Sequence, residues 1–176
     1  MGDPVPSKRL QGAHVFEDSL VRELVEARLI GVFATRDPLT SIHAVPMWYA
    51  VHEGRVLLAT GSRSRKVRNL ERDPRATLVV HDSRPGFEVC GTSISGEVEI
   101  VRGPEAVGLV DLVHARYVAE GADEDPAVRV FLTSDDVALR LRPIDALTWD
   151  ERDSAASEAL RARGAALPLV STDPRG

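Results

Sequence analysis

The chain has 176 residues, of which 43% are hydrophobic and 28% charged, and its formal net charge at pH 7 is −5. These values are ordinary for one globular domain, and the negative charge argues against a general nucleic-acid binder, which needs a broad basic surface. A single cysteine, Cys90, fits a reducing compartment, and no apolar run approaches the roughly 20 residues of a membrane span; we therefore expect a cytoplasmic protein.

The first part of the chain is predicted to form a flexible arm over residues 1–14, a helix over 18–27 and strands over 29–35 and 42–51. Asp18 or Ser19 can cap the helix. The second strand contains Pro46, which has no N–H donor and therefore belongs at a sheet edge or a bulge. Such a place leaves backbone groups for a planar ligand, although Met47, Trp48 and Tyr49 are equally compatible with an interrupted apolar core.

Residues 55–80 predict a strand, a tight turn, a short helix and a second strand. The turn is Thr60-Gly61-Ser62, and Ser64 can cap the helix. The helix begins with Arg65 and Lys66, although cations are disfavoured in the first turn by roughly 0.3–1 kcal/mol each. An anion such as a phosphate, bound by the hydroxyls and the cations together, would explain this charge pattern.

The alternative is a solvated basic face, formed by Arg63, Arg65, Lys66, Arg68 and Arg72. The glycine pattern of a P-loop and that of a dinucleotide-binding loop are both absent from this segment. The loop therefore fits one terminal phosphate better than a nucleotide triphosphate.

The second part of the chain is predicted to form a strand over residues 87–101, a helix over 104–120, a shorter helix over 128–132, strands over 137–141 and 144–149, and a flexible tail over 151–176. Gly96 marks close packing or a bend in the first of these strands. The serines near Gly96 have the wrong spacing for a nucleophile elbow, which argues against an esterase. Residues 15–150 are therefore expected to form the folded domain.

These elements predict a mainly β (α+β) fold, a six-stranded antiparallel barrel with inserted helices. The run from Thr60 to Arg75 resembles the phosphate-binding segment of the pyridoxamine 5'-phosphate oxidase-like split-barrel family, within the flavin and deazaflavin oxidoreductases. His43–Tyr49 resembles the preceding strand of that family, Ser93–Glu99 a later strand and Leu141–Asp150 the closing strand. Together these segments extend over about residues 16–150.

The resemblance implies a split barrel that forms a homodimer, with the cofactor in a groove at the subunit interface. It implies that the phosphate is held by Thr60, Ser64, Arg65 and Lys66. It further implies that backbone groups of Val45, Pro46, Met47 and Trp48 line the isoalloxazine-type ring, and that Trp149 approaches the ring. No catalytic side chain and no metal ligand are assigned, because the cofactor supplies the chemistry.

The resemblance is closest to the F420-dependent branch, so the deazaflavin coenzyme F420 is the expected cofactor and FMN is the alternative. Arg63 or Arg68 is then expected to meet the acidic tail of F420. True pyridoxamine phosphate oxidases carry a C-terminal Arg/His substrate signature, whereas here Asp150, Glu151 and Arg152 follow Trp149. The resemblance therefore does not extend to oxidation of vitamin B6.

The expected function is an oxidoreductase that transfers a hydride between the bound cofactor and a small organic substrate. Two alternatives remain from other classes. Some split barrels bind haem, for which a histidine ligand could come from His14, His43, His52, His81 or His114. A non-catalytic protein that binds or stores the cofactor is the second alternative.

Overall fold

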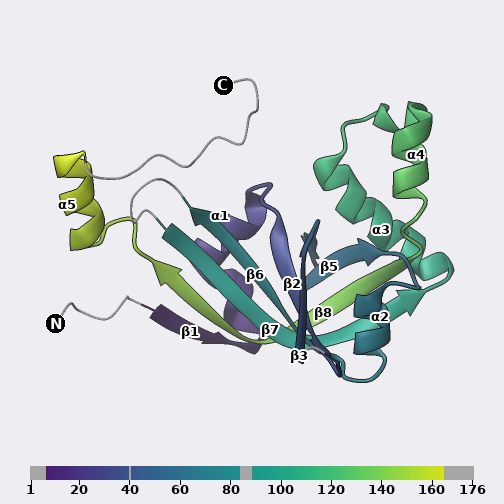
Figure 1. Cartoon of the computed structure of the whole chain (residues 1–176), viewed down its shortest axis with the longest axis horizontal. Coiled ribbons are helices and arrows are strands. Elements are labelled where there is room, and N and C mark those ends of the chain that lie inside the picture. Colours follow the sequence, from purple (N-terminus) through teal and green to yellow (C-terminus); the bar gives the residue numbers. More distant parts are fainter. Residues whose placement is uncertain (1–6, 40, 84–88, 165–176) are drawn as a thin grey trace.

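The structure is a computed structural model that describes residues 7–39, 41–83 and 89–164 (Figure 1). Within these residues, eight strands form one antiparallel sheet, with helices packed around it. No helix in these ranges is both long enough and apolar enough to cross a membrane. The helices α3 and α4 lie at one end of the molecule, and α5 lies at the opposite end (Figure 1).

The strands are β1 (Ser7–Gln11), β2 (Gly31–Asp37), β3 (Ser41–Met47), β4 (Ala50–His52), β5 (Arg55–Thr60), β6 (Arg75–Ser83), β7 (Val89–Arg102) and β8 (Val137–Asp150). The α-helices are α1 (Ser19–Glu26), α2 (Arg65–Leu70), α3 (Pro104–Tyr117), α4 (Pro126–Leu132) and α5 (Ala155–Arg163). Two 3₁₀ helices, η1 (Gly12–Glu17) and η2 (Ala122–Glu124), precede α1 and α4. The side chain of Asp18 caps α1 by accepting from the N–H groups of Leu20 and Val21, as the sequence predicted.

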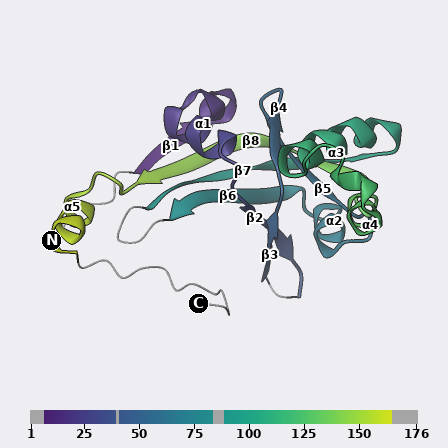
Figure 2. The same ribbon diagram turned by 90° about the horizontal axis from the view of Figure 1, so that it is seen from above.

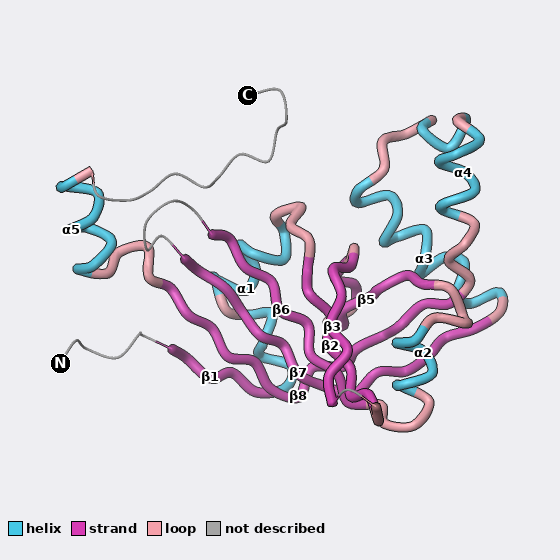
Figure 3. Tube along the Cα trace, viewed as in Figure 1, coloured by secondary structure: helices cyan, strands magenta, loops and turns pink. Residues whose placement is uncertain are grey.

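The sheet is open, with strand order β3-β2-β6-β7-β8-β5-β4 and with β1 paired to the second half of β8. The two long strands β7 and β8 run side by side along its length (Figure 3). The prediction of a six-stranded barrel is therefore wrong in strand number and in closure. The antiparallel architecture and the α+β class are confirmed.

The two open edges of the sheet are formed by β3 and β4, which both come from the single strand predicted over residues 42–51. This segment forms two strands, because the chain leaves β2 after Met47 and joins β5 at Ala50. Trp48 and Tyr49 bridge the two edges, and Tyr49 is fully buried. Pro46 lies on the edge strand β3, where the lack of an N–H donor removes no second ladder bond.

The opposite error occurred at residues 137–149, where two strands were predicted and one continuous strand, β8, forms. β8 stays continuous through Pro143, and the irregularity in its ladder with β7 is a register shift between Ser95 and Gly96. A Cβ at Gly96 would lie 2.0 Å from the carbonyl oxygen of Arg142, so only glycine fits this approach. The expected close packing at Gly96 is thus confirmed.

Both ends of the chain contain more structure than the sequence indicated. Residues 7–14 of the predicted arm form β1 and the start of η1, and residues 155–163 of the predicted tail form α5. β1 is ordered by its ladder with β8, a partner more than 130 residues away in the sequence. Residues 1–6 and 165–176, the remaining parts of the predicted arm and tail, lie outside the described residues.

The core has two parts that share β5. Val56 and Leu58 belong to the main cluster with Phe33 and Tyr49, whereas Leu57 belongs to a second cluster under α3. Because both faces of β5 are covered, its sequence is a continuous apolar run with no polar alternation. Figure 2 shows α1 on one side of the sheet, and its buried residues complete the main cluster. The second cluster fixes α3 beside the end of β5, where the predicted phosphate loop begins.

Candidate functional site

Three of the predicted phosphate contacts meet at the end of β5. Lys66 Nζ donates to Thr60 Oγ1 at 3.0 Å, and Thr60 Oγ1 donates to Ser64 Oγ at 3.4 Å. Thr60 is buried, whereas Ser64 and Lys66 are partly buried. Ser64 occupies the N-cap position of α2, but its hydroxyl makes no capping bond. We call Thr60, Ser64 and Lys66 the hydroxyl–lysine cluster.

The ammonium group of Lys66 is poorly compensated. Burial lowers its pKa, and the negative charge of Asp135 offsets this only in part. In the described ranges, no carboxylate lies within ion-pair distance of Lys66. A partly buried cation without a paired anion is energetically unfavourable, and a bound anion would relieve this cost.

Arg65 is less free than the sequence suggested. Its Nε donates at 2.6 Å to Oδ2 of Asp37, which ends β2 and whose side chain is only 4% exposed. This hydrogen bond raises the pKa of Arg65. A phosphate at the cluster would therefore compete with Asp37 for this guanidinium, so the assignment of Arg65 as a phosphate ligand remains a prediction.

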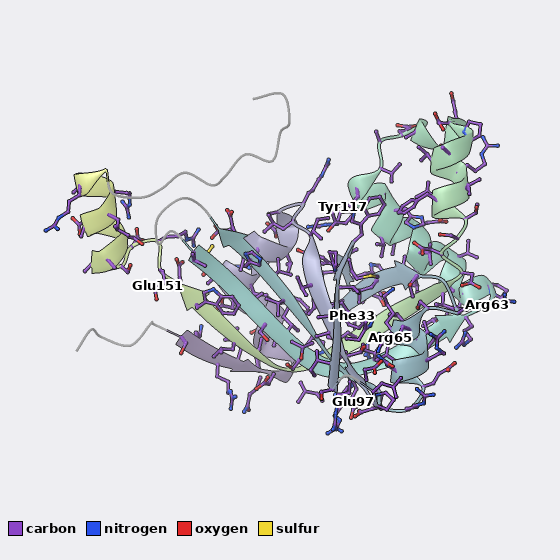
Figure 4. The ribbon with its side chains drawn as sticks, in the orientation of Figure 1. Phe33, Arg63, Arg65, Glu97, Tyr117 and Glu151 are labelled. Atoms are coloured by element: carbon purple, nitrogen blue, oxygen red, sulfur yellow. The ribbon has the colours of Figure 1, made fainter. Side chains whose placement is uncertain are left out.

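The other cations of this segment, Arg63, Arg68 and Arg72, are exposed. Figure 4 shows Arg63 and Arg65 at the same end of the molecule. The alternative of a solvated basic face thus describes these arginines, whereas Lys66 is turned toward Thr60. Lys66 therefore differs from these arginines in its contact with Thr60 and not in its charge.

A carboxylate fixes the turn between β5 and α2. Asp136 accepts from the backbone N–H of Ser62 at 2.5 Å and from Ser62 Oγ at 2.7 Å, which lowers the pKa of Asp136. The turn also packs closely on the loop between α4 and β8, since a Cβ at Gly61 would lie 3.0 Å from the carbonyl oxygen of Ser134. Ser62 is therefore already bonded, and Asp136 holds the loop in place beside the start of β8.

A groove next to the cluster contains three of the predicted ring contacts. It has a volume of about 420 Å³, and its walls include Ile30, Pro46, Met47, Trp48, Phe131 and Asp135. We call it the β3 groove. Ala59, which also lines it, directly precedes Thr60 of the cluster. Val45 is half-buried opposite Phe33 in the β2–β3 ladder and is not in the wall of this groove.

The side chain of Trp48 packs against α3 and α4. Its ring stacks on Tyr117 with a centroid distance of 5.1 Å and an interplanar angle of 6°, and it meets Phe131 edge-on at 5.5 Å. Its third aromatic neighbour is His114, whose Nε2 lies 3.0 Å from Oδ2 of Asp135. These contacts fix the Trp48 side chain between α3 and α4.

Trp149 lies far from the other predicted site residues. It pairs with Gly91 and Ser7 near the end of β8, whereas Thr60 pairs with Val137 at the beginning of that strand. At roughly 3.3 Å per residue, the two ends of β8 are about 40 Å apart. Glu151, two residues beyond Trp149, is seen far from Arg65 in Figure 4. Within one chain, Trp149 cannot contact a ligand at the cluster.

Sequence reasoning missed several residues that shape the site, namely Asp37, Phe131, Asp135 and Asp136. The two last precede β8 and reach the phosphate loop only because β5 and β8 pair. His114 was considered only as a haem ligand, although it is buried against Asp135. Asp37 carried a weak signal, since its carboxylate ends a strand just before Pro38.

A second cavity, of about 640 Å³, lies between α3 and the segment around α4, and Asp135 borders both it and the β3 groove. No group of three or more His, Cys, Asp or Glu side chains that could hold a metal ion occurs in residues 7–39, 41–83 and 89–164. The hydroxyl–lysine cluster and the β3 groove contain six of the nine predicted contact residues, namely Thr60, Ser64, Lys66, Pro46, Met47 and Trp48.

Comparison with a family model shows that residues 18–149 match the family described as pyridoxamine 5'-phosphate oxidase. This range includes all nine predicted contact residues, from Val45 to Trp149. A comparison with curated proteins returned no match.

Solved structures are similar along most of the chain. A conserved hypothetical protein from Mycobacterium tuberculosis, Rv2991, is 30% identical, with a TM-score of 0.65 over 92% of this chain and 96% of that one. An F420 reductase is 24% identical, with a TM-score of 0.53 over 71% and 94% of the two chains. HutZ, the haem storage protein from Vibrio cholerae, is 14% identical, with a TM-score of 0.57 over 74% and 92%. The last two similarities support the fold alone.

Proposed function

This chain belongs to the pyridoxamine 5'-phosphate oxidase family, and on that basis we propose that it is an oxidoreductase dependent on F420, or alternatively on FMN. The bound cofactor would supply the hydride chemistry, and the substrate would be a small organic molecule. The residues of this chain would bind and orient the two reactants and exclude water from them.

The observation that carries the proposal is that the ammonium group of Lys66 is partly buried and bonded to Thr60 with no carboxylate of the described residues within ion-pair distance. A phosphate at the hydroxyl–lysine cluster would pair with its ammonium group and replace the solvation lost on burial. Ser64 would contribute its hydroxyl hydrogen, because Ser64 Oγ only accepts from Thr60 within the cluster. The donor set therefore fits a phosphate ester.

The β3 groove fits the ring of the cofactor. Its walls are mainly apolar, and β3 is an edge strand that pairs with β2 on one side of the sheet order. The ring would lie along Pro46, Met47 and Trp48, with the phosphate chain leading past Ala59 to the cluster. The stack of Trp48 on Tyr117 would keep this wall rigid.

The choice of F420 over FMN rests on the resemblance of the strand around Trp48 and of the loop after Thr60 to the deazaflavin branch. Arg63 and Arg68 are exposed beside the cluster, and the guanidinium of Arg68 donates to the carbonyl oxygen of Arg63 at 2.5 Å. They would meet the acidic tail of F420, which FMN lacks. In contrast, Arg152, where a pyridoxamine substrate signature would lie, is paired with Asp150 and Glu23.

We also propose a homodimer in which the outer face of β2, β6, β7 and β8 forms the interface. This face carries a hollow of about 320 Å³ whose walls include small side chains, Ala34, Thr77 and Ser95, and two exposed isoleucines, Ile42 and Ile144. Exposed apolar surface of this kind favours association. A second copy could also bring Trp149 to the cofactor site, which a single chain cannot do.

The test is equilibrium titration of the purified chain with F420, FMN and haemin, followed by absorbance and fluorescence. We expect F420 to bind most tightly and the reduced cofactor to be reoxidised by at least one member of a panel of enones and quinones. Tighter binding of FMN would select the alternative cofactor. A Soret band with no binding of either F420 or FMN would contradict the proposal.

A further inference from the structure

The helix α4 is apolar but is not part of the core. Six of its seven residues, Pro126–Leu132, are apolar, and none of the seven is buried. Val130 is 70% exposed and Phe131 54% exposed. A helix with this composition is normally buried in a protein interior. Its exposed apolar surface is therefore a candidate binding site for an apolar ligand.

Phe131 stands between two hollows. One is the β3 groove, and the other has a volume of about 480 Å³ and is lined by Trp48, Tyr117, Ala122, Ala127, Val128 and Phe131, among others. We call the second one the α4 hollow. Trp48 and Phe131 contribute to the walls of both, and their rings meet edge-on. The two hollows are therefore neighbours that share these two side chains in their walls.

The chemistry of the α4 hollow differs from that of the β3 groove. None of the described residues that line it carries a charge, whereas Asp135 borders the β3 groove. The hydroxyl of Tyr117 already donates to the carbonyl oxygen of Leu29 at 2.8 Å. A charged group placed there would lose hydration without gaining a partner, whereas an aromatic ring or alkyl chain would gain apolar contacts.

We propose that the β3 groove and the α4 hollow hold one elongated substrate. Its reacting end lies in the β3 groove, beside the cofactor ring, and an uncharged aromatic or alkyl part lies in the α4 hollow under Phe131. The volume of the hollow is in the range of small-molecule sites, and it shares the walls of Trp48 and Phe131 with the groove, which favours a substrate that passes over these rings over a second protein chain. The position of the reacting end rests on the proposed function, whereas binding in the α4 hollow does not require a cofactor.

Two fluorescent probes with the same ring frame test the hollow directly. N-phenyl-1-naphthylamine is uncharged, and 8-anilino-1-naphthalenesulfonate carries a sulfonate. We expect the full chain to bind the uncharged probe at least tenfold more tightly. Equal affinities, or tighter binding of the sulfonate, would overturn the proposal.

Two substitutions on α4 form a matched pair. Val128→Trp fills the hollow, and Val130→Trp adds the same ring two residues away, where the side chain lines neither hollow. We expect the first to weaken binding of the uncharged probe at least tenfold and the second to change it less than twofold. Ala122→Leu, which fills the hollow from η2, should reproduce the first result if Val128→Trp does not fold. Similar effects of the filling and the control substitutions would contradict the assignment.

The cofactor titration distinguishes this inference from the proposed function. Val128→Trp should leave the affinity for F420 or FMN within threefold of that of the unsubstituted chain. If neither cofactor binds but the probe results hold, the proposed function fails and the apolar site remains. If Val128→Trp and Val130→Trp both abolish self-association in light scattering, a second copy covers α4 and the substrate proposal is wrong.

Discussion

At the scale of single residues, the proposed phosphate contact of Lys66 predicts how cofactor binding depends on pH. Burial lowers the pKa of Lys66 in the free protein, and a bound phosphate would raise it again, so binding favours the protonated form. We therefore expect affinity to be constant near pH 7 and to fall as the pH rises through the pKa of Lys66. Lys66→Arg should remove this alkaline decline, because the guanidinium stays charged. Cofactor titrations between pH 7 and pH 10 measure the affinity of both chains. A decline that persists in Lys66→Arg would exclude Lys66 as its source.

A buried hydrogen bond between Asn69 and Thr35 attaches α2 to β2. Asn69 Nδ2 donates at 3.1 Å to Thr35 Oγ1, and both side chains are almost completely buried. Asn69→Ala should cost about 1–3 kcal/mol of unfolding free energy, since the buried hydroxyl of Thr35 loses the N–H group from which it accepts and keeps only its 3.5 Å bond to the carbonyl oxygen of His43. Urea denaturation is the measurement, and exposed Arg72→Ala, on the same segment, is the control with an expected change below about 0.5 kcal/mol. Equal effects of the two substitutions would mean that the pair is not needed.

How far the site could be predicted depended on the distance between partners along the chain. Thr60, Ser64 and Lys66 come together as expected because they belong to one turn and the helix after it. Arg65 meets Asp37, which lies 28 positions earlier, and nothing in the local pattern of either residue specifies that pairing. Buried partners of this kind depend on the strand order, and the strand order could not be predicted from the local sequence pattern.

At the scale of elements, the register shift in β7 depends on one glycine. Gly96→Ala would place a methyl group 2.0 Å from the backbone oxygen of Arg142, and a backbone atom cannot move away as a flexible side chain can. We expect the unfolding free energy to fall by about 1–3 kcal/mol. Gly108→Ala is the matched control, because no atom lies within 4 Å of its Cβ in α3; it should stabilise by up to about 1 kcal/mol. Thermal and urea denaturation compare the two, and a neutral Gly96→Ala would contradict the packing described.

The strand errors have a common physical origin. Apolar and β-branched residues identify extended backbone, but they do not show which neighbour each part of the backbone pairs with. The segment around Trp48 therefore resembled one strand although it changes partners, and the two halves of β8 resembled two strands although both pair with β7. β1 was missed because its order comes from pairing with β8 and not from its own composition.

At the scale of the whole molecule, the outer face of the sheet is the surface on which the proposed dimer depends. Ile144→Glu places a charge beside the hollow formed with Ile42, and burial of that charge against a second copy would be costly. We expect the substituted chain to be a monomer at concentrations where the unsubstituted chain is a dimer, as measured by size-exclusion chromatography with light scattering. Val130→Glu, on exposed α4, should leave the dimer intact. A monomeric unsubstituted chain would rule out the proposed assembly.

The central claim is that a phosphate-bearing cofactor binds at the hydroxyl–lysine cluster, and a pair of charge reversals tests it most directly. Lys66→Glu and Arg72→Glu change the net charge equally, but only Lys66 is partly buried and bonded to Thr60, whereas Arg72 is exposed. In an F420 and FMN titration, we predict that Lys66→Glu weakens binding of the preferred cofactor by about 100-fold or more, equivalent to about 2.7 kcal/mol, and that Arg72→Glu weakens it by less than about tenfold. Equal losses in the two variants would show that only a diffuse basic surface is involved, and would contradict the account.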